Sequence, residues 1–226
     1  MKISEYNIES EKITETLTFI MISDLHNKPY KNIINQVREE NPDAILIPGD
    51  LVDRHRKTYK RVLPFLRECN TIAPTFMSLG NHEVKFPVIV PSRIRETGTI
   101  LLDNEYVPFH NILIGGHSPK TERTWLKTFE EEEKYKILLN HHPEDWNEYL
   151  KDRKIDLILS GHAHGGQIRI FNIPLFSPGQ GIFPKYTKGF YGNMIVGAGV
   201  SNTAGIIPRL GNPRELVKIT IRPKNT

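Results

Sequence analysis

The sequence holds a single cysteine, Cys69, among its 226 residues. A disulfide framework and a cysteine-rich zinc site are therefore both excluded within one chain. This cysteine usage favours a reducing, cytoplasmic location, and Cys69 is expected to pack in a core, since free cysteines are usually buried. Glycine and proline number 16 each and show no triplet repeat, which excludes a collagen-like fibre.

Long apolar runs are absent as well. No stretch approaches the roughly 18 apolar residues that a membrane-spanning helix needs. Residues 1–15 are polar and contain no apolar core of a secretory signal. We therefore expect a cytoplasmic protein without a transmembrane segment, and peripheral association with a membrane stays open.

The charge balance is mildly basic, with 30 Lys and Arg against 26 Asp and Glu and a net charge of +4. Such a surplus suits anionic substrates. It is too small to indicate nucleic-acid binding by itself.

Hydrophobic residues make up 38% of the chain, which is enough for a substantial core. The pattern predicts strands at residues 17–23, 44–48, 72–79, 112–115, 135–140 and 155–160, and helices at 31–40, 58–70, 88–96, 120–132 and 144–151. This alternation of strands and helices indicates an α/β fold. Further short strands are expected at 167–170, 194–198 and 216–221. We assign residues 1–226 to one domain, because the polar motifs need both halves of the chain.

Polar clusters directly follow five of the predicted strands. They are Asp24-Leu25-His26, Gly49-Asp50-Leu51-Val52-Asp53-Arg54, Gly80-Asn81-His82-Glu83, Asn140-His141-His142-Pro143 and Gly161-His162-Ala163-His164. Ligands of layered α/β folds bind at the carboxyl ends of strands, so the five clusters should converge on one place. Glycines in these clusters, such as Gly49 and Gly80, are expected to let the backbone turn sharply there.

The residue types and their spacing point to metal ions. Alternate residues of an extended segment point the same way, so Asp24 and His26 can face one ion, and so can His162 and His164. A donor set of Asp, His and Asn without sulfur suits Mn²⁺, Fe, Zn²⁺ or Mg²⁺. Seven candidate ligands are too many for one ion, and they suit two ions about 3.5–4 Å apart that share a carboxylate.

The ordered set D-x-H, G-D-x-x-D, G-N-H-E, H-x-P and G-H-x-H-G resembles the calcineurin-like metallophosphoesterase family along nearly the whole chain. The stretch SPGQGIFPKYTKGFYG, followed by VGAGVSNT, is similar to a branch of small bacterial phosphodiesterases. The resemblance implies a four-layer α/β/β/α sandwich of two mixed sheets flanked by helices. It also implies a dinuclear, metal-dependent phosphoesterase.

The resemblance also assigns roles to the matching residues. The metal ligands would be Asp24, His26 and His164 for the first ion, Asn81, His141 and His162 for the second ion, and Asp50 as the bridge between them. His82 would act as general acid, Asp53 would orient His82, and Arg54 would contact the phosphate. His142 competes with His141 as a ligand, although the H-x-P register favours His141. The remaining histidines are expected to be exposed loop residues, namely His55, His110 and His117.

The implied reaction is hydrolysis of a phosphodiester. Two cations, with manganese among the candidates, neutralise the phosphate, and a water bridging them loses its proton and attacks phosphorus in line. His82 then protonates the leaving oxygen. The alternatives are a pyrophosphatase acting on nucleotide-linked lipids, a phosphomonoesterase, and a non-enzymatic scaffold of the same fold. The expected partner is a small phosphorylated substrate such as a diester, a nucleotide or a lipid head group, with no specific nucleic acid; the oligomeric state stays open.

Overall fold

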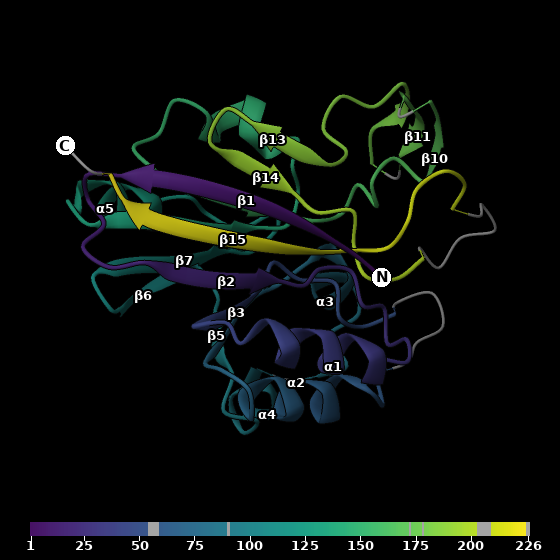
Figure 1. The fold of residues 1–226 in the computed structure, drawn as a ribbon, viewed down its shortest axis with the longest axis horizontal. Helices are drawn as coiled ribbons and strands as arrows, with labels where there is room; N and C mark the ends of the chain where they lie inside the picture. The colour runs from purple at the N-terminus through teal and green to yellow at the C-terminus, as the bar shows by residue number, and fades with distance from the viewer. Residues whose placement is uncertain (54–58, 90, 172, 178, 203–208, 225–226) are drawn as a thin grey trace.

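The computed structural model describes residues 1–53, 59–89, 91–171, 173–177, 179–202 and 209–224. Two six-stranded sheets form its centre (Figure 1). The first sheet has, in spatial order, the strands β1 (Lys2–Ser10), β15 (Glu215–Pro223), β2 (Leu17–Met21), β3 (Ala44–Ile47), β4 (Thr75–Ser78) and β5 (Ile100–Leu102). The second has β13 (Gly189–Tyr191), β14 (Met194–Val196), β9 (Leu157–Ser160), β8 (Tyr135–Asn140), β7 (Ile112–His117) and β6 (Glu105–Phe109).

Both sheets are mixed. In the first sheet, β2, β3 and β4 are mutually parallel, and β15 pairs with β2 in the antiparallel sense. In the second sheet, β7, β8 and β9 are parallel, and β6 and β13 are antiparallel to their neighbours. Parallel strands need crossover connections, and the helices between them supply these.

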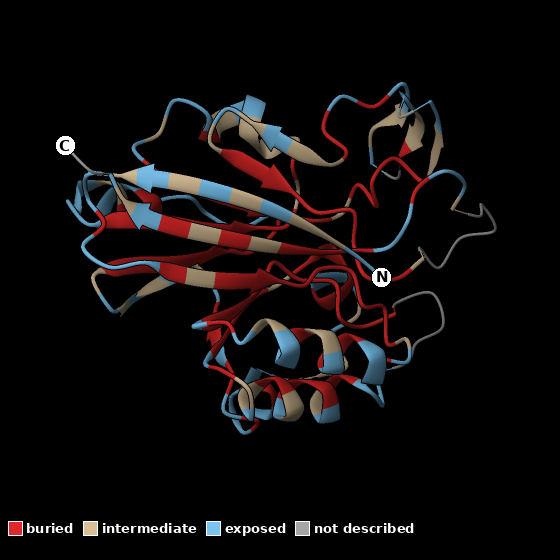
Figure 2. Cartoon of the chain, viewed as in Figure 1, coloured by how far each residue is buried: buried red, intermediate tan, exposed pale blue. Residues whose placement is uncertain are grey.

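Each central strand is apolar on both faces because both faces are covered. On β2, Phe19 packs into the core between the two sheets, whereas Ile20 packs against helices. On β8, Leu139 faces the core between the sheets and Leu138 faces the opposite side. Figure 2 shows these central strands buried almost throughout, in contrast to the partly exposed edge strand β1.

Helices complete the outer layers. Against the first sheet lie α1 (Lys31–Glu40), α2 (Val62–Asn70) and α4 (Pro91–Arg95), which share a core with β2 and β3. Against the second sheet lie α5 (Trp125–Glu131) and the single π-helical turn η1 (Trp146–Leu150). The four-layer α/β/β/α arrangement expected from the sequence is confirmed. No helix within the described ranges is both long and apolar enough to cross a membrane.

In several places the local structure adds to or differs from what the sequence predicts. A helix was expected at residues 58–70, with Pro64 starting, kinking or splitting it. The helix α2 begins at Val62, so Pro64 lies in the first turn, where its missing N–H removes no helical hydrogen bond. The polar N-terminus forms β1, which pairs with β15 over nine residue pairs. A third, small sheet made of β10 (Ile168–Ile170), β11 (Ile173–Ser177) and β12 (Gly181–Ile182) had no counterpart among the expected layers.

His117 was expected in an exposed loop, and this was wrong. It lies at the end of β7 with 2% of its surface exposed. The Trp125 indole donates a hydrogen bond to its Nδ1 over 3.3 Å. His110 is exposed as expected, Cys69 is fully buried as expected, and His55 lies outside the described residues.

Candidate metal centre

The five polar clusters follow β2, β3, β4, β8 and β9, as the sequence predicted. The parallel strands of each sheet end at the same edge, so the loops that follow them gather there (Figure 1). Contacts between the sheets bring the two sets of loops together: His141 Nδ1, after β8, lies 2.8 Å from the carbonyl of Pro48, after β3. The site therefore lies where the edges of the two sheets meet.

The first group of donors consists of Asp24, His26 and His164, all buried. The Nε2 atoms of His26 and His164 are 3.1 Å apart. Asp24 Oδ1 lies 3.5 Å from Nε2 of His164 and 3.9 Å from Nε2 of His26. Three ligand atoms thus point at one small volume, which is the arrangement that a divalent cation requires.

The second group lies around His141, His142 and His162, whose ring nitrogens also cluster within 4.8 Å. The ring centroids of His141 and His162 are 5.1 Å apart. Asn81 enters this group through its Oδ1, which lies 3.2 Å from Nε2 of His142. The predicted ligands Asn81, His141 and His162 therefore lie together, with His142 among them.

Asp50 lies between the two groups. Its Oδ2 is 3.0 Å from Nε2 of His141 in the second group, and its carboxylate also clusters with Asp24 and with His26 of the first group. Its Oδ1 accepts a hydrogen bond from the backbone N–H of His82 over 2.7 Å. One oxygen of this carboxylate is thus fixed by the chain, and the other faces the ring nitrogens.

Backbone carbonyls set the orientation of the imidazole rings. The carbonyl oxygen of Val52 lies 3.3 Å from Nδ1 of His26 and 3.2 Å from Nδ1 of His82. The carbonyl of Pro48 holds Nδ1 of His141 in the same way. A carbonyl can only accept, so each Nδ1 carries the proton, and each Nε2 of a neutral ring presents a lone pair to the site.

Five of the candidate ligands have a left-handed backbone. They are Asp24, His26, Asp50, His162 and His164, with φ between 47° and 65°. Such a conformation costs about 1 kcal/mol or more per non-glycine residue, and it persists where the surroundings enforce it. Its repetition at one site indicates that the loops are held for the placement of side chains and not for stability.

Gly49 and Gly80 act by allowing close approach. A Cβ atom on Gly49 would lie 2.4 Å from the amide nitrogen of Gly80, and one on Gly80 would lie 2.3 Å from Oδ1 of Asp50. Gly49 also has a φ of +99°, so the expected sharp turn is present there, whereas the φ of Gly80 is −99°. The role of Gly80 is therefore to make room for the Asp50 carboxylate.

Glu83 is a structural residue of the site that the sequence interpretation left without a role. Its buried carboxylate accepts hydrogen bonds from the backbone N–H groups of Asp50, Leu51, Val52 and Gly80, at 2.7–3.0 Å. Burial and the nearby Asp50 raise the pKa of Glu83, and these hydrogen bonds oppose the rise. The feature of the sequence that could have identified Glu83 is its position directly after Asn81 and His82 in the G-N-H-E motif.

Ser201 supports the first group from the far end of the chain. Its hydroxyl donates to the carbonyl of Asp24 over 2.7 Å. Arg209, which is largely buried, donates to the carbonyls of Ser201 and Ala198 at 2.9 Å each. Residues 196–202, the described part of the segment VGAGVSNT, thus stabilise the strained backbone of Asp24.

The types of donor atom fit metal ions, and some of these atoms lack a hydrogen-bond partner among the described residues. Asp24 Oδ2 and His164 Nδ1 are buried without a hydrogen-bond partner among the described residues. Burial, together with the neighbouring His164, lowers the pKa of His26 to about 3. Burial also lowers the pKa of His141, but the Asp50 carboxylate outweighs it and raises that pKa to about 10. His26 is therefore neutral and ready to bind a cation, whereas His141 carries a proton that a bound divalent cation would displace.

Two of the three residues expected to act on the substrate, His82 and Asp53, lie in the described part of the chain. His82 is buried next to the first group, its ring centroid 4.4 Å from that of His26 and its Nε2 3.9 Å from Oδ2 of Asp50. Asp53 is fully buried directly after Val52, whose carbonyl holds His82. Arg54 lies outside the described residues.

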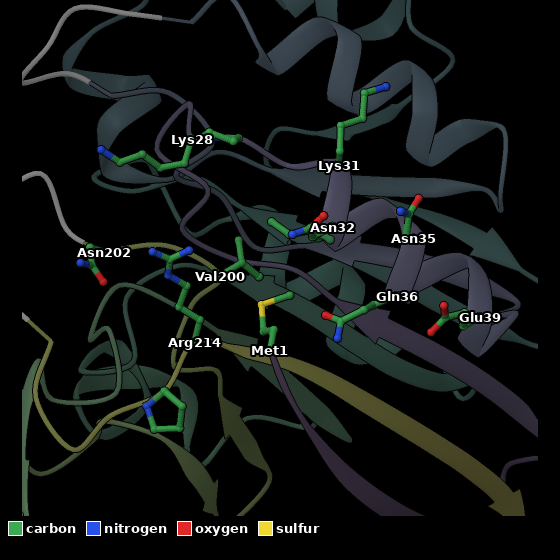
Figure 3. A pocket seen from close by; sticks show the side chains of 13 residues that line it. Met1, Lys28, Lys31, Asn32, Asn35, Gln36, Glu39, Val200, Asn202 and Arg214 are labelled. Carbon is green, nitrogen blue, oxygen red and sulfur yellow. The ribbon is translucent and has the colours of Figure 1, made fainter.

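A cavity of about 1030 Å³ lies along helix α1 and the N-terminal end of β1, and none of the candidate ligands is among its lining residues (Figure 3). Its lining includes Lys28, Asn32, Asn202 and Arg214, with Met1 and Val200 between them. Lys28 follows His26 by two residues, so their Cα atoms are within about 7 Å of each other. Val200 is hydrogen-bonded to the carbonyl of Ser23, directly before Asp24. The cavity is thus connected to the metal centre through the loop of Asp24 and His26, whereas the loop of His164 does not line it.

The fold and this donor set define a metal-dependent hydrolase built at the junction of two sheets. The sequence model of the calcineurin-like phosphoesterases matches residues 17–166. A metallophosphoesterase of Aquifex aeolicus is 30% identical, over 99% of this chain and 93% of its own length. The chain belongs to the calcineurin-like phosphoesterase family, as predicted, and it is a metal-dependent phosphoesterase.

Two further relatives bear on the function. A metallophosphoesterase of Helicobacter pylori is 28% identical over 99% of this chain, which spans only 65% of that longer protein. A protein of Escherichia coli K12 named phosphodiesterase YaeI is 30% identical over 58% of this chain and 52% of its own length. The family is therefore established over the whole length of the chain, whereas the phosphodiesterase name belongs to a relative matched over part of it.

Proposed function

We propose that this phosphoesterase is a dinuclear phosphodiesterase. The observation that carries the proposal is the position of Asp50, whose carboxylate clusters both with Asp24 and His141 and with His26. A carboxylate shared by two groups of ligands is what two adjacent cations require. The first ion would be held by Asp24, His26 and His164, the second by Asn81, His141 and His162, and Asp50 would bridge them.

Two divalent cations would neutralise the phosphate charge and lower the pKa of the attacking water. The chain itself supplies orientation and a proton. The Val52 carbonyl accepts the Nδ1 proton of His82, so a second proton on that ring sits on Nε2, the atom nearer to Asp50. That Nε2 proton is the one available for the leaving oxygen. Asp53, buried directly after Val52, would stabilise the charged ring, and Arg54 would contact the phosphate.

The cavity along α1 supports a diester as substrate. A diester carries a second substituent that a monoester lacks, and this substituent needs a place outside the metal centre. The cavity lined by Lys28, which follows His26 by two residues, offers such a space, with the Arg214 side chain also at its wall (Figure 3). The name of the Escherichia coli relative points the same way.

A panel of chromogenic phosphomonoesters, phosphodiesters and pyrophosphates tests the proposal. The purified protein is treated with a chelator and then supplied with Mn²⁺, Fe²⁺, Zn²⁺ or Mg²⁺ separately. We expect activity to disappear with the chelator, to return with Mn²⁺, and to be highest on diesters. Faster turnover of monoesters or pyrophosphates would reassign the reaction, and the metal content of the active protein, two ions or one, would decide the nuclearity.

A further inference from the structure

The charge of the chain is unevenly distributed. Residues 157–214 contain five Lys and Arg and none of the 26 Asp and Glu of the protein. The other 168 residues carry 25 basic and 26 acidic side chains, so their charges nearly cancel. The whole net positive charge therefore resides in one acid-free segment. That segment includes the small sheet β10–β12, and its exposed cations include Lys185 and Arg214.

The same segment exposes an unusual amount of apolar surface. Of the eleven large apolar side chains that are exposed in the described part of the chain, six lie on or directly beside the small sheet. We call these six the hairpin surface: Ile170, Phe171, Ile173, Ile182, Phe183 and Leu210. Phe171, in the turn between β10 and β11, is 94% exposed, and Ile182 is 74% exposed. Figure 2 shows this end of the molecule as largely exposed and half-buried.

The hairpin surface is attached to the metal centre. The hydroxyl of Ser177, on β11, donates to the carbonyl of Ala163 over 2.9 Å, between the candidate ligands His162 and His164. A Cβ atom on Gly179 would lie 2.5 Å from Nε2 of His162. Leu210 joins the sheet because its carbonyl accepts a hydrogen bond from the amide of Arg169. Anything that binds the hairpin surface is thus held beside the metal centre.

The shape and charge of this surface identify its occupant. Phe171 lies in the turn of a hairpin that protrudes from the body of the protein (Figure 1), and it is 94% exposed. Side chains of this kind enter the boundary between lipid head groups and acyl chains. Anionic lipids attract basic residues near the bilayer, and the segment itself contributes no acidic side chain that would oppose this attraction.

We propose that the hairpin surface docks the protein on an anionic lipid bilayer. The apolar tips enter the interface, and Lys185, two residues after Phe183, lies at head-group level. Docking presents the edge that carries the metal centre to the membrane. The proposal concerns where the protein binds, and it holds independently of which phosphate ester the metal centre hydrolyses.

Co-sedimentation of the full chain with vesicles tests the proposal. Vesicles of phosphatidylcholine with phosphatidylglycerol are compared with vesicles of phosphatidylcholine alone, at low and high salt. We expect partitioning onto the anionic vesicles that weakens with salt. The double variant Phe171→Ser/Ile182→Ser should lose about 100-fold in partition coefficient, about tenfold for each apolar side chain. Ile100→Ser, a matched change at a 37% exposed side chain on β5, should leave partitioning unchanged.

Two further measurements separate the outcomes. Thermal unfolding and hydrolysis of a soluble chromogenic ester should be the same for the double variant and the wild type, because both replaced side chains are exposed. Equal partitioning of wild type and double variant, or no partitioning of wild type at low salt, would overturn the proposal. A wild-type dimer that the double variant converts to a monomer would instead assign the surface to a second copy of the chain. Failure to hydrolyse any ester would refute the proposed function and leave the vesicle result standing.

Discussion

The Nε2 atoms of His26 and His164 lie 3.1 Å apart, although 138 residues separate the two histidines in the chain. The Val52 carbonyl fixes the Nδ1 proton of His26, so the Nε2 of the neutral ring presents a lone pair toward His164. Two imidazoles placed in this way, with Asp24 next to them, make a site that a cation stabilises. This geometry motivates the predictions on the metal centre that follow.

Asp50→Asn should be the most damaging change of a ligand. It removes the negative charge that we propose bridges the two ions, while keeping the size of the side chain. We expect activity to fall by at least about 100-fold and the metal content to fall as well. Elemental analysis and diester turnover measure the two effects. The exposed Asp152→Asn serves as control, and an Asp50 variant that retained two metals and near-normal turnover would contradict the bridging assignment.

His82→Ala should slow substrates according to their leaving group. An alkoxide needs a proton to leave, whereas a nitrophenolate hardly does, and general acid catalysis contributes roughly 10²–10⁴-fold. We expect a large loss on alkyl diesters, a small loss on nitrophenyl diesters, and unchanged metal content. Rates over a series of leaving groups give the test. Equal losses across the series would assign His82 to phosphate binding or to structural support.

Glu83→Gln should loosen the loop that holds Asp50. The amide of Gln has one oxygen acceptor, whereas both carboxylate oxygens of Glu83 accept backbone N–H groups, which include those of Leu51 and Gly80. We expect the free energy of unfolding to fall by about 1–3 kcal/mol and the metal affinity to fall with it. Chemical denaturation and metal titration measure both. Glu122→Gln, an exposed counterpart, should change neither, and an unaffected Glu83 variant would show that the loop holds its shape without this carboxylate.

Arg214→Gln should reveal whether the cavity along α1 binds the second substituent of a diester. Arg214 is exposed at the cavity wall, so its attraction for an anionic substituent is modest. We expect KM to rise about two- to fivefold for a nitrophenyl diester with an additional phosphate on its other substituent. The KM for nitrophenyl methyl phosphate should stay constant. Arg222→Gln, at the far end of β15, is the matched control; equal KM changes for both diesters would place the substituent elsewhere.

His117 should make stability depend on pH. Burial, with smaller contributions from Arg123 and Arg153, lowers its pKa to about 4, below the 6.5 expected in the unfolded chain. Between these values the unfolded state binds more protons, so stability is complete above pH 6.5 and is lost as the pH falls toward 4. The loss amounts to about 3 kcal/mol. His117→Gln, which can still accept from Trp125, should show a flatter dependence of the unfolding midpoint on pH than the wild type.

The exposed His110→Gln should retain the wild-type dependence. The measurement is made on metal-free protein, so that release of ligands at low pH does not add to the signal. Parallel curves for wild type and His117→Gln would show that another group causes any pH dependence that is observed.

The sequence predicted those structural elements whose formation depends on residues close to one another in the chain. Helix α1 was predicted at residues 31–40 and β8 at residues 135–140, and the structure has both elements at these residues. Their apolar patterns are unambiguous, and Pro42 follows the end of the helix. The candidate ligands were also visible, because five clusters of Asp, His and Asn directly follow apolar strands, whose carboxyl ends were expected to converge on one place.

Structural features that depend on residues far away in the sequence could not be predicted in this way. The polar segment Lys2–Ser10 becomes a strand because Glu215–Pro223 lies beside it, and nothing within the segment predicts that partner. His117 is buried because Trp125 and the rest of the second layer cover it.

The sequence by itself determined the chemistry of this protein: which donors it has, that they follow strands, and to which family the motifs belong. Only the tertiary structure decided how the donors are used. It set Asp50 between two groups of imidazoles, placed Glu83 under four backbone amides, and built the hairpin surface beside His162. The reason is that residue types and periodicity act within a few residues, whereas these contacts join segments tens to hundreds of residues apart and form only when the two sheets pack together.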